Sequence, residues 1–259
     1  MVLADLPAST TGPDAAVVRV LSYNIRSLRD DREALARVIR ACAPDVVCVQ
    51  EAPRFFRWRR AAARLARETG LVYVTGGATA TGPMILTSPR ARIERSEDVL
   101  LPHVPGLHRR GFATAVLRFG GGHRDDDGIR LGVVSCHLSL AAAERYDQAG
   151  MLLDRIAALD VPYAVAGGDI NEQPEGRAFR RIAGTLRDGW ATEPWGSEAT
   201  FDPVDPRRRI DALFASDGVE IIGCGVPSGL PGVDGADLRA ATDHLPVLAA
   251  LRLPRVPLL

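Results

Sequence analysis

The sequence predicts an α/β fold, because short apolar runs with strand character alternate along the chain with segments of helical periodicity. Val46-Val47-Cys48-Val49 is apolar at every position, which is typical of a strand covered on both faces of its sheet. The preceding segment, Arg32–Cys42, instead carries Leu35, Val38 and Ile39 at helical spacing. Alternation of this kind favours layers of sheet and helix around a shared core.

The length and charge of the chain limit its class. At 259 residues it can bury a substantial core, and no linker divides it, so we expect a flexible leader over 1–15 and a single domain over 16–254. The 32 basic residues balance 32 acidic ones, which excludes the global positive field of a nucleic-acid coat but not a local basic groove. Every basic residue is arginine, so Schiff-base chemistry and a phosphate-loop lysine are excluded.

The cysteines indicate a reducing environment. Cys42, Cys48, Cys136 and Cys224 lack the spacing of a metal site, and Cys48 and Cys136 sit within apolar runs, so we expect buried free thiols. Met1–Ala16 shows no signal-peptide pattern, and no segment is apolar over the ~20 residues that a membrane span needs. We therefore expect a cytoplasmic protein without a membrane span, and we take it to be a monomer.

The first elements each have a local signal. The β-branched run Ala15–Leu21 predicts a strand. Asp30 or Asp31 can cap the helix over Arg32–Cys42, and Pro44 ends it. Further strands are expected over residues 71–75, 83–88 and 92–101.

A second helix is expected over Arg54–Thr69. Its apolar stripe consists of Phe55, Trp58, Ala62 and Leu65. Its polar stripe consists of four arginines, which fit either a phosphate backbone or a solvated surface: Arg57, Arg60, Arg64 and Arg67.

The second half of the chain begins with a predicted hairpin of Gly111–Phe119 and Ile129–Leu138. Its loop contains Asp125-Asp126-Asp127-Gly128, which lacks the alternation of a calcium loop and reads as a polar turn. Ser139 can cap a helix over Leu140–Leu159. The remaining elements are a strand from Pro162, a helix over 175–183, a strand headed by Asp211, a Gly/Pro-rich connection over 223–235 and a last strand over 247–253. The long loop over 190–208, rich in Pro, Thr and Trp, is of a form that more often borders a site than a core.

Polar side chains follow most of these strands, at the point where each strand ends. In the central case, the apolar run 164–168 ends in two glycines and then presents Asp169 and Asn171 on one face. An Asx turn capping a helix over 174–182 would also explain this tetrapeptide, and caps or structural histidines would explain the other cases singly. The whole set is Asn24, Glu51, His137, Asp169, Asn171, Asp211, Asp243 and His244.

These strand ends are expected to gather in one place, as they do in sandwiched-sheet proteins. Carboxylates together with amides suit a hard divalent cation such as Mg²⁺, which takes oxygen ligands and leaves water positions open for a phosphate. Zinc fits less well, because no closely spaced His/Cys set is present.

Six motifs occur in order between residues 17 and 253. They are a strand ending in Asn24, Gln50-Glu51, a strand ending in His137-Leu138, Gly168-Asp169-Ile170-Asn171, Arg209-Ile210-Asp211, and Asp243-His244-Leu245-Pro246. This series resembles the metal-dependent endonuclease/exonuclease/phosphatase superfamily, which includes pancreatic deoxyribonuclease, abasic-site endonucleases and neutral sphingomyelinases. The resemblance implies a four-layer αββα sandwich of two mixed β-sheets flanked by helices.

The same resemblance implies a role for each polar residue. Glu51 is expected to be the main ligand of Mg²⁺, with Mn²⁺ as a substitute, and Asn24 and Asp243 complete or orient the metal site. Asp169 resembles the group that aligns and deprotonates the attacking water. Asn171 is expected to donate a hydrogen bond to the phosphoryl oxygen.

The histidines complete this implied site. His244 resembles the phosphate-contacting histidine, and Asp211 the carboxylate that holds its tautomer and raises its pKa. His137 is expected to assist the leaving oxygen or to bind the phosphate.

Two differences from the abasic-site endonucleases indicate which branch of the superfamily the chain resembles. The abasic-site branch typically has a carboxylate where Arg26 stands and a tyrosine where His137 stands, which disfavours abasic-site repair. Both residues look more like the deoxyribonuclease and sphingomyelinase branch, in which the arginine can contact phosphate. Arg110 similarly resembles a phosphate-contacting arginine of that branch, although an ordinary surface arginine explains it nearly as well.

The leading hypothesis is a Mg²⁺-dependent phosphoesterase that cleaves phosphodiester bonds, with nucleic acid as one candidate substrate. A phosphatase or phospholipase-like esterase acting on a small or lipid head-group phosphate is the alternative, which the neutral net charge slightly favours. A binding module without catalysis remains a third hypothesis, because fold does not dictate function.

Overall fold

The computed structural model describes residues 3–120 and 128–255 and contains two β-sheets. The strands of the first sheet are β1 (Thr10–Thr11), β2 (Ala15–Asn24), β3 (Val46–Gln50), β4 (Val72–Gly76), β5 (Met84–Thr87), β12 (Glu220–Gly225) and β13 (Val247–Pro254). They lie in the order β12-β13-β2-β3-β5-β4, with β1 paired to β2.

The strands of the second sheet are β6 (Ala91–Leu100), β7 (Gly111–Phe119), β8 (Ile129–His137), β9 (Tyr163–Asp169), β10 (Arg187–Asp188) and β11 (Asp211–Ala215). Their order is β10-β11-β9-β8-β7-β6.

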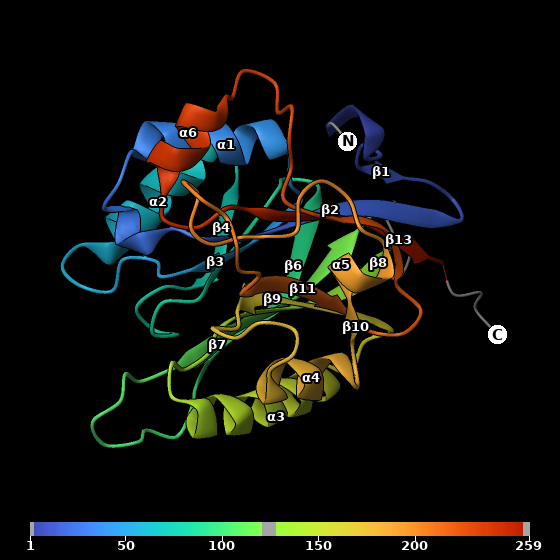
Figure 1. Cartoon of the computed structure of the whole chain (residues 1–259). Helices are drawn as coiled ribbons and strands as arrows, with labels where there is room; N and C mark the ends of the chain where they lie inside the picture. The colour runs from blue at the N-terminus through green and yellow to red at the C-terminus, as the bar shows by residue number, and fades with distance from the viewer. Residues whose placement is uncertain (1–2, 121–127, 256–259) are drawn as a thin grey trace.

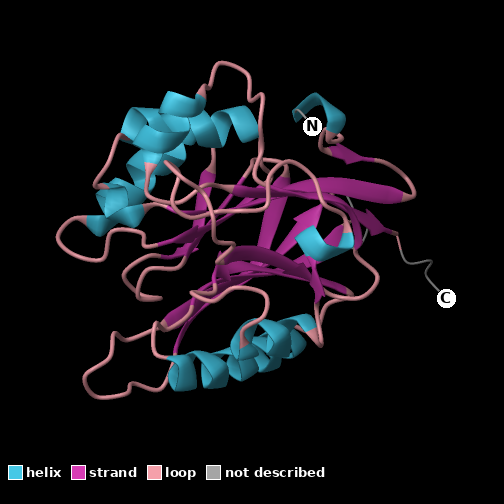
Figure 2. Cartoon of the chain, viewed as in Figure 1, coloured by secondary structure: helices cyan, strands magenta, loops and turns pink. Residues whose placement is uncertain are grey.

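Helices cover the outer face of each sheet, and the sheets face each other (Figures 1 and 2). The helices over the first sheet are α1 (Arg32–Cys42), α2 (Trp58–Thr69) and α6 (Gly235–Ala241), and those over the second are α3 (Ala142–Ala158) and α4 (Arg177–Ala183). Three further short helices are η1 (Leu3–Asp5), η2 (Arg26–Leu28) and α5 (Gly189–Thr192). One apolar cluster fills the space between the sheets, and two others lie between each sheet and its helices. The predicted four-layer sandwich is confirmed.

Each sheet contains one parallel pair, and these pairs position the site. β2 and β3 are parallel and are joined through α1, and β8 and β9 are parallel and are joined through α3. The remaining pairs are antiparallel, so both sheets are mixed. In β9, Gly168 lies so close to β8 that a Cβ atom there would meet the Cys136 carbonyl oxygen at 2.3 Å. Glycine is therefore needed at this position for the close approach of the two strands.

Several predicted elements are confirmed with their local causes. α1 has the predicted bounds, and its N-cap is Asp31, whose Oδ1 accepts the N–H groups of Glu33 and Ala34. The hairpin of β7 and β8 forms as predicted. An Asx turn is present at Asp169, but the amino end of α4 is capped by Glu172, whose Oε2 accepts from two backbone N–H groups. Asp169 is thus not a helix cap.

The start of α2 differs from the prediction. The helix begins at Trp58 rather than Arg54, because Arg57 has a left-handed backbone with φ 61°. Phe55, expected in the apolar stripe, is 81% exposed, and Phe56 is 89% exposed. The rest of the predicted stripe holds, because Ala62 and Leu65 are buried, Trp58 is half-buried, and Ala66 adds to the same buried face.

Other differences concern caps and short elements. α3 has Ala141 as its N-cap without a side-chain bond, while Ser139 Oγ accepts the Ala141 N–H. β12 extends into the predicted Gly/Pro-rich connection, where Gly225 fits against the backbone of Trp195. Within the predicted flexible leader, β1 pairs with β2 and Leu6 is 2% exposed. The acidic run 125–127 lies outside the described residues.

The predicted state of the cysteines is confirmed. Cys42, Cys48, Cys136 and Cys224 are buried and free. Burial raises the pKa of the Cys42 and Cys48 thiols to about 12 and raises the pKa of the other two as well. None of the described helices combines the length and the apolar character needed to cross a bilayer.

Candidate active site

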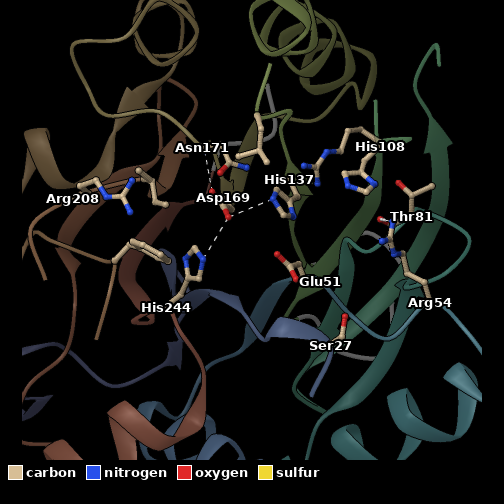
Figure 3. A pocket seen from close by; sticks show the side chains of 14 residues that line it. Ser27, Glu51, Arg54, Thr81, His108, His137, Asp169, Asn171, Arg208 and His244 are labelled. Atoms are coloured by element: carbon tan, nitrogen blue, oxygen red, sulfur yellow. Dashed lines mark hydrogen bonds and ion pairs between the residues drawn. The ribbon is translucent and has the colours of Figure 1, made fainter. Parts of the chain in front are cut away.

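The strand ends of the two sheets meet at a polar cavity of about 380 Å³ (Figure 3). Its lining combines predicted site residues with residues of the segments that connect the strands: Ser27, Glu51, Arg54, Thr81, His108, Arg110, His137, Leu140, Asp169, Asn171, Phe201, Arg208, Ile210 and His244. Residues from opposite ends of the sequence therefore face one space.

Asp169 lies at the centre of this site and is 2% exposed. Its Oδ2 accepts from Asn24 Nδ2 at 3.1 Å and lies 3.4 Å from His137 Nε2 and 3.8 Å from His244 Nε2. Its Oδ1 accepts the backbone N–H of Asn171 at 2.9 Å. Burial raises the pKa of Asp169, and the two histidines oppose that rise without cancelling it. A carboxylate held in this way has the raised pKa that suits a general base.

Asn24 links Asp169 to Glu51. Its Nδ2 also donates to Glu51 Oε1 at 3.2 Å, while its Oδ1 accepts the backbone N–H of Arg26 at 3.1 Å. That backbone bond fixes the amide so that its NH₂ group points at both carboxylates. Glu51 itself follows β3 in a left-handed conformation with φ 53°, a strained turn of the kind that recurs at functional sites.

The two histidines differ in charge. His244 Nδ1 donates to Asp211 Oδ2 at 2.9 Å. Burial lowers the pKa of His244, but Asp211, Asp169 and Asp243 outweigh it and raise this pKa to about 9. Burial lowers the pKa of His137 to about 4, with Arg110 and His244 adding to that effect against Asp169. Near neutral pH the site therefore holds one imidazolium and one neutral imidazole.

A comparison with family models identifies this arrangement. The model described as the Endonuclease/Exonuclease/phosphatase family matches residues 21–244, a range that holds every predicted site residue from Asn24 to His244. The chain belongs to this endonuclease/exonuclease/phosphatase family. Among curated proteins, no sequence matches the chain.

Solved structures share the fold of this family member. An endonuclease/exonuclease/phosphatase from Bacteroides vulgatus has a TM-score of 0.74 at 18% identity, covering 92% of this chain and 99% of that one. A mannosyl-6-phosphatase from Bacteroides thetaiotaomicron has a TM-score of 0.71 at 18% identity, covering 90% and 99%. TDP2 from D. rerio, complexed with a single-strand DNA product, has a TM-score of 0.67 at 18% identity, covering 91% and 98%. At these identities the likeness shows the fold.

Of three further predicted site residues, Arg110 lines the cavity, whereas Arg26 and Asp243 are not among its lining residues. The buried Nε of Arg110 has no hydrogen-bond partner among the described residues. The guanidinium of Arg26 lies on Asp30 at 3.3 Å and on Asp243 at 3.2 Å. Asp243 is thus held by an arginine, whereas Glu51 faces the cavity.

Sequence reasoning missed several lining residues of this family member, because they lie on loops without periodicity. Phe201 and Arg208 belong to the long loop that was expected to border a site, and that expectation is confirmed. The Phe201 ring packs edge-on against His244, with centroids 4.9 Å apart, and the Arg208 guanidinium lies 4.5 Å from the Phe201 ring centre. Arg54 and His108 had no signal beyond their side-chain type.

Thr200, which is 1% exposed, joins the segments that carry Asp211 and His244. Its Oγ1 accepts the backbone N–H groups of Ile210 at 3.1 Å and Asp211 at 3.2 Å. Its carbonyl oxygen accepts the N–H of Leu245, next to His244, at 2.7 Å. The hydroxyl therefore holds the head of β11 in place relative to His244.

The Thr200→Val substitution leaves two buried N–H groups without their acceptor. We expect it to lower kcat about tenfold and to lower the free energy of unfolding by about 2 kcal/mol. Thr200→Ser keeps the hydroxyl and should retain both. The control is Thr87→Val at the opposite end of the first sheet, where a buried hydroxyl donates to the Asp45 carbonyl at 2.9 Å. Loss of kcat in the control as well, measured beside chemical denaturation, would contradict a specific role for Thr200.

Proposed function

We propose that the chain is a Mg²⁺-dependent phosphoesterase that hydrolyses phosphodiester bonds by attack of a water molecule. The observation that supports this proposal is the arrangement of polar side chains on the cavity wall. The Asp169 carboxylate is held there between His137 and His244, and Asn24 connects it to the Glu51 carboxylate. A base, a cationic phosphate contact and a carboxylate for a cation thus face one space.

The oxygen donors of the wall fit a hard divalent cation. Glu51 lines the cavity and forms no ion pair within residues 3–120 and 128–255, so its charge is left for a cation to balance. Asp169, Asp211 and His244 also place ligand atoms within 4.8 Å of one another, but Asp211 and His244 already bond each other. We therefore assign Glu51 as the main ligand. A bound Mg²⁺ supplies charge that stabilises the phosphoryl transition state.

Asp169 and His244 perform the central steps. Asp169 accepts a proton from the attacking water, whose oxygen forms a bond to phosphorus while the bond to the leaving oxygen breaks. The leaving group departs as an oxyanion that takes a proton from solvent, and Asp169 then returns its proton to water. His244, held as a cation by Asp211, faces the cavity with Nε2 and hydrogen-bonds a phosphoryl oxygen. Asn171 retains an amide hydrogen for the same developing charge, since one is used on the Leu138 carbonyl at 3.0 Å.

His137 and Arg110 complete the proposed phosphate site. With its pKa lowered to about 4, His137 is neutral and binds phosphate as a hydrogen-bond donor rather than protonating the leaving oxygen. Arg110, with its buried unpaired Nε, offers a further charged donor to the cavity. Together these groups surround a phosphate with donors.

The second candidate is a phosphatase or phospholipase-like esterase. The similarity in fold to a mannosyl-6-phosphatase supports a sugar-phosphate substrate, whereas the similarity to TDP2 in complex with a single-strand DNA product supports a nucleic-acid substrate. The same site chemistry could hydrolyse either substrate, so the two functions must be distinguished by measuring turnover of each kind of ester.

The test measures Mg²⁺-dependent hydrolysis of a bis-aryl phosphodiester, an aryl phosphomonoester and plasmid DNA side by side. We expect diester turnover that EDTA abolishes, and a Glu51→Ala variant that loses about 10³-fold in kcat and no longer binds Mg²⁺ in a calorimetric titration. Asp30→Ala, which removes a half-buried carboxylate outside the cavity, is the control. Turnover confined to the monoester would establish the phosphatase instead, and no turnover with no Mg²⁺ binding would favour a binding module.

A further inference from the structure

The most exposed large apolar side chains of the described residues lie on segments that line the cavity. They are Phe56 (89% exposed), Phe55 (81%), Val204 (76%) and Leu140 (72%). Phe55 and Phe56 follow the lining residue Arg54, Leu140 is itself a lining residue, and Val204 lies between Phe201 and Arg208. We call these four side chains the apolar rim. Exposed apolar side chains on segments that border one cavity favour a contact surface over scattered surface residues.

Positive charge accompanies the Phe55 and Phe56 part of this rim, whereas Val204 lies between Asp202 and Asp205. The segment 53–60 reads Pro-Arg-Phe-Phe-Arg-Trp-Arg-Arg and contains no acidic residue. The segment 101–110 also contains no acidic residue and ends in His108, Arg109 and Arg110. Arg54 of the first segment and His108 and Arg110 of the second line the same cavity. A surface with apolar side chains and adjacent arginines complements one that is apolar inside and anionic outside.

The details of the rim favour a lipid surface over a nucleic acid. Leu140 and Val204 have no ring on which a base could stack. The arginine neighbours of the two phenylalanines already lie over their rings, with Arg54 at 5.7 Å from the Phe55 centroid and Arg57 at 5.1 Å from that of Phe56. Arginines beside apolar side chains can keep their charge at the headgroup level while the apolar groups enter the acyl region.

We propose that the apolar rim docks on an anionic lipid bilayer, so that the phosphate ester entering the cavity belongs to a phospholipid head group of that surface. This inference rests on the proposed phosphoesterase function and specifies its substrate class. Docking would place the mouth of the cavity at the depth of the lipid phosphates, within reach of Arg54 and Arg110.

Vesicle sedimentation tests the docking without any need for turnover. The probes are vesicles of phosphatidylcholine alone and vesicles containing about 30 mol % phosphatidylglycerol. We expect wild-type protein to bind the anionic vesicles about tenfold more strongly than the neutral ones, and Phe55→Ser with Phe56→Ser to lower that binding about tenfold. The matched control is Val72→Ser with Ile93→Ser, two side chains 43% and 39% exposed on strands away from the rim, which should bind as wild type does.

Three results would overturn the proposal. One is wild-type protein that binds neither kind of vesicle, and another is equal binding by the Phe55 and Phe56 double variant. The third is salt-sensitive binding of a single-stranded oligonucleotide that the double variant loses, which would assign the rim to nucleic acid. Turnover of the soluble bis-aryl phosphodiester is measured separately, so its absence beside intact vesicle binding would refute the proposed function and leave the docking standing.

Discussion

Asp169→Asn is expected to lower kcat for a bis-aryl phosphodiester by about 10³-fold or more, because the variant has no group that can take the proton of the attacking water. KM should change little, since the phosphate contacts of His244, Asn171 and Arg110 remain. The substitution preserves size and keeps an Oδ1 acceptor for the Asn171 N–H. Its new NH₂ group, however, meets the Asn24 amide, so thermal unfolding must be recorded beside the kinetics.

The control for this prediction is Glu172→Gln. Glu172 belongs to the same connection, but it contacts Arg145 and the amino end of α4 rather than the cavity. Its loss should reduce stability by about 1 kcal/mol through the weakened cap and leave kcat unchanged. Full activity in Asp169→Asn would remove Asp169 from the role of base, whatever the stability of the variant.

The second large effect is expected from Asp211→Asn, in the pH dependence of kcat/KM. In the wild type the His244 pKa is raised to about 9, so the imidazolium is present below that pH and is lost as the pH rises through it. Activity should therefore fall on the alkaline side near pH 9. Asp211→Asn removes the largest cause that raises this pKa while burial continues to lower it, so the alkaline limb must move to lower pH.

At neutral pH the same variant should lose about 10²-fold in kcat/KM, because the imidazole loses both its charge and its orienting partner. Asp188→Asn serves as the matched control, since Asp188 is also buried but pairs with Arg209 at 2.8 Å instead of with a histidine. We expect the control to keep the alkaline limb near pH 9. An unshifted limb in Asp211→Asn would mean that His244 does not act as a cation.

Local patterns in the sequence are sufficient to predict the α/β class and most of the helices and strands. Periodicity reports which side chains are buried, and burial is a local pattern in a strand such as Val46-Val47-Cys48-Val49 or in α1 with its Asp31 cap. The order of the six motifs determined the family, which the match to residues 21–244 shows. Polar residues after apolar strands also identified the Asp169 region as the part of the chain around which a site would form.

The hydrogen bonds and charge states of these residues depend on tertiary packing. Asn24 and Asp169 are 145 positions apart, and their hydrogen bond depends on how the two sheets are packed. The different charge states of His137 and His244 follow from burial and from the carboxylate that each one faces, which no spacing in the sequence encodes. The late start of α2, which leaves Phe55 and Phe56 exposed beside the cavity, follows from one left-handed residue that propensity alone does not reveal. Distant contacts, desolvation and backbone strain arise only once the layers are assembled, and for that reason no local pattern in the sequence contains them.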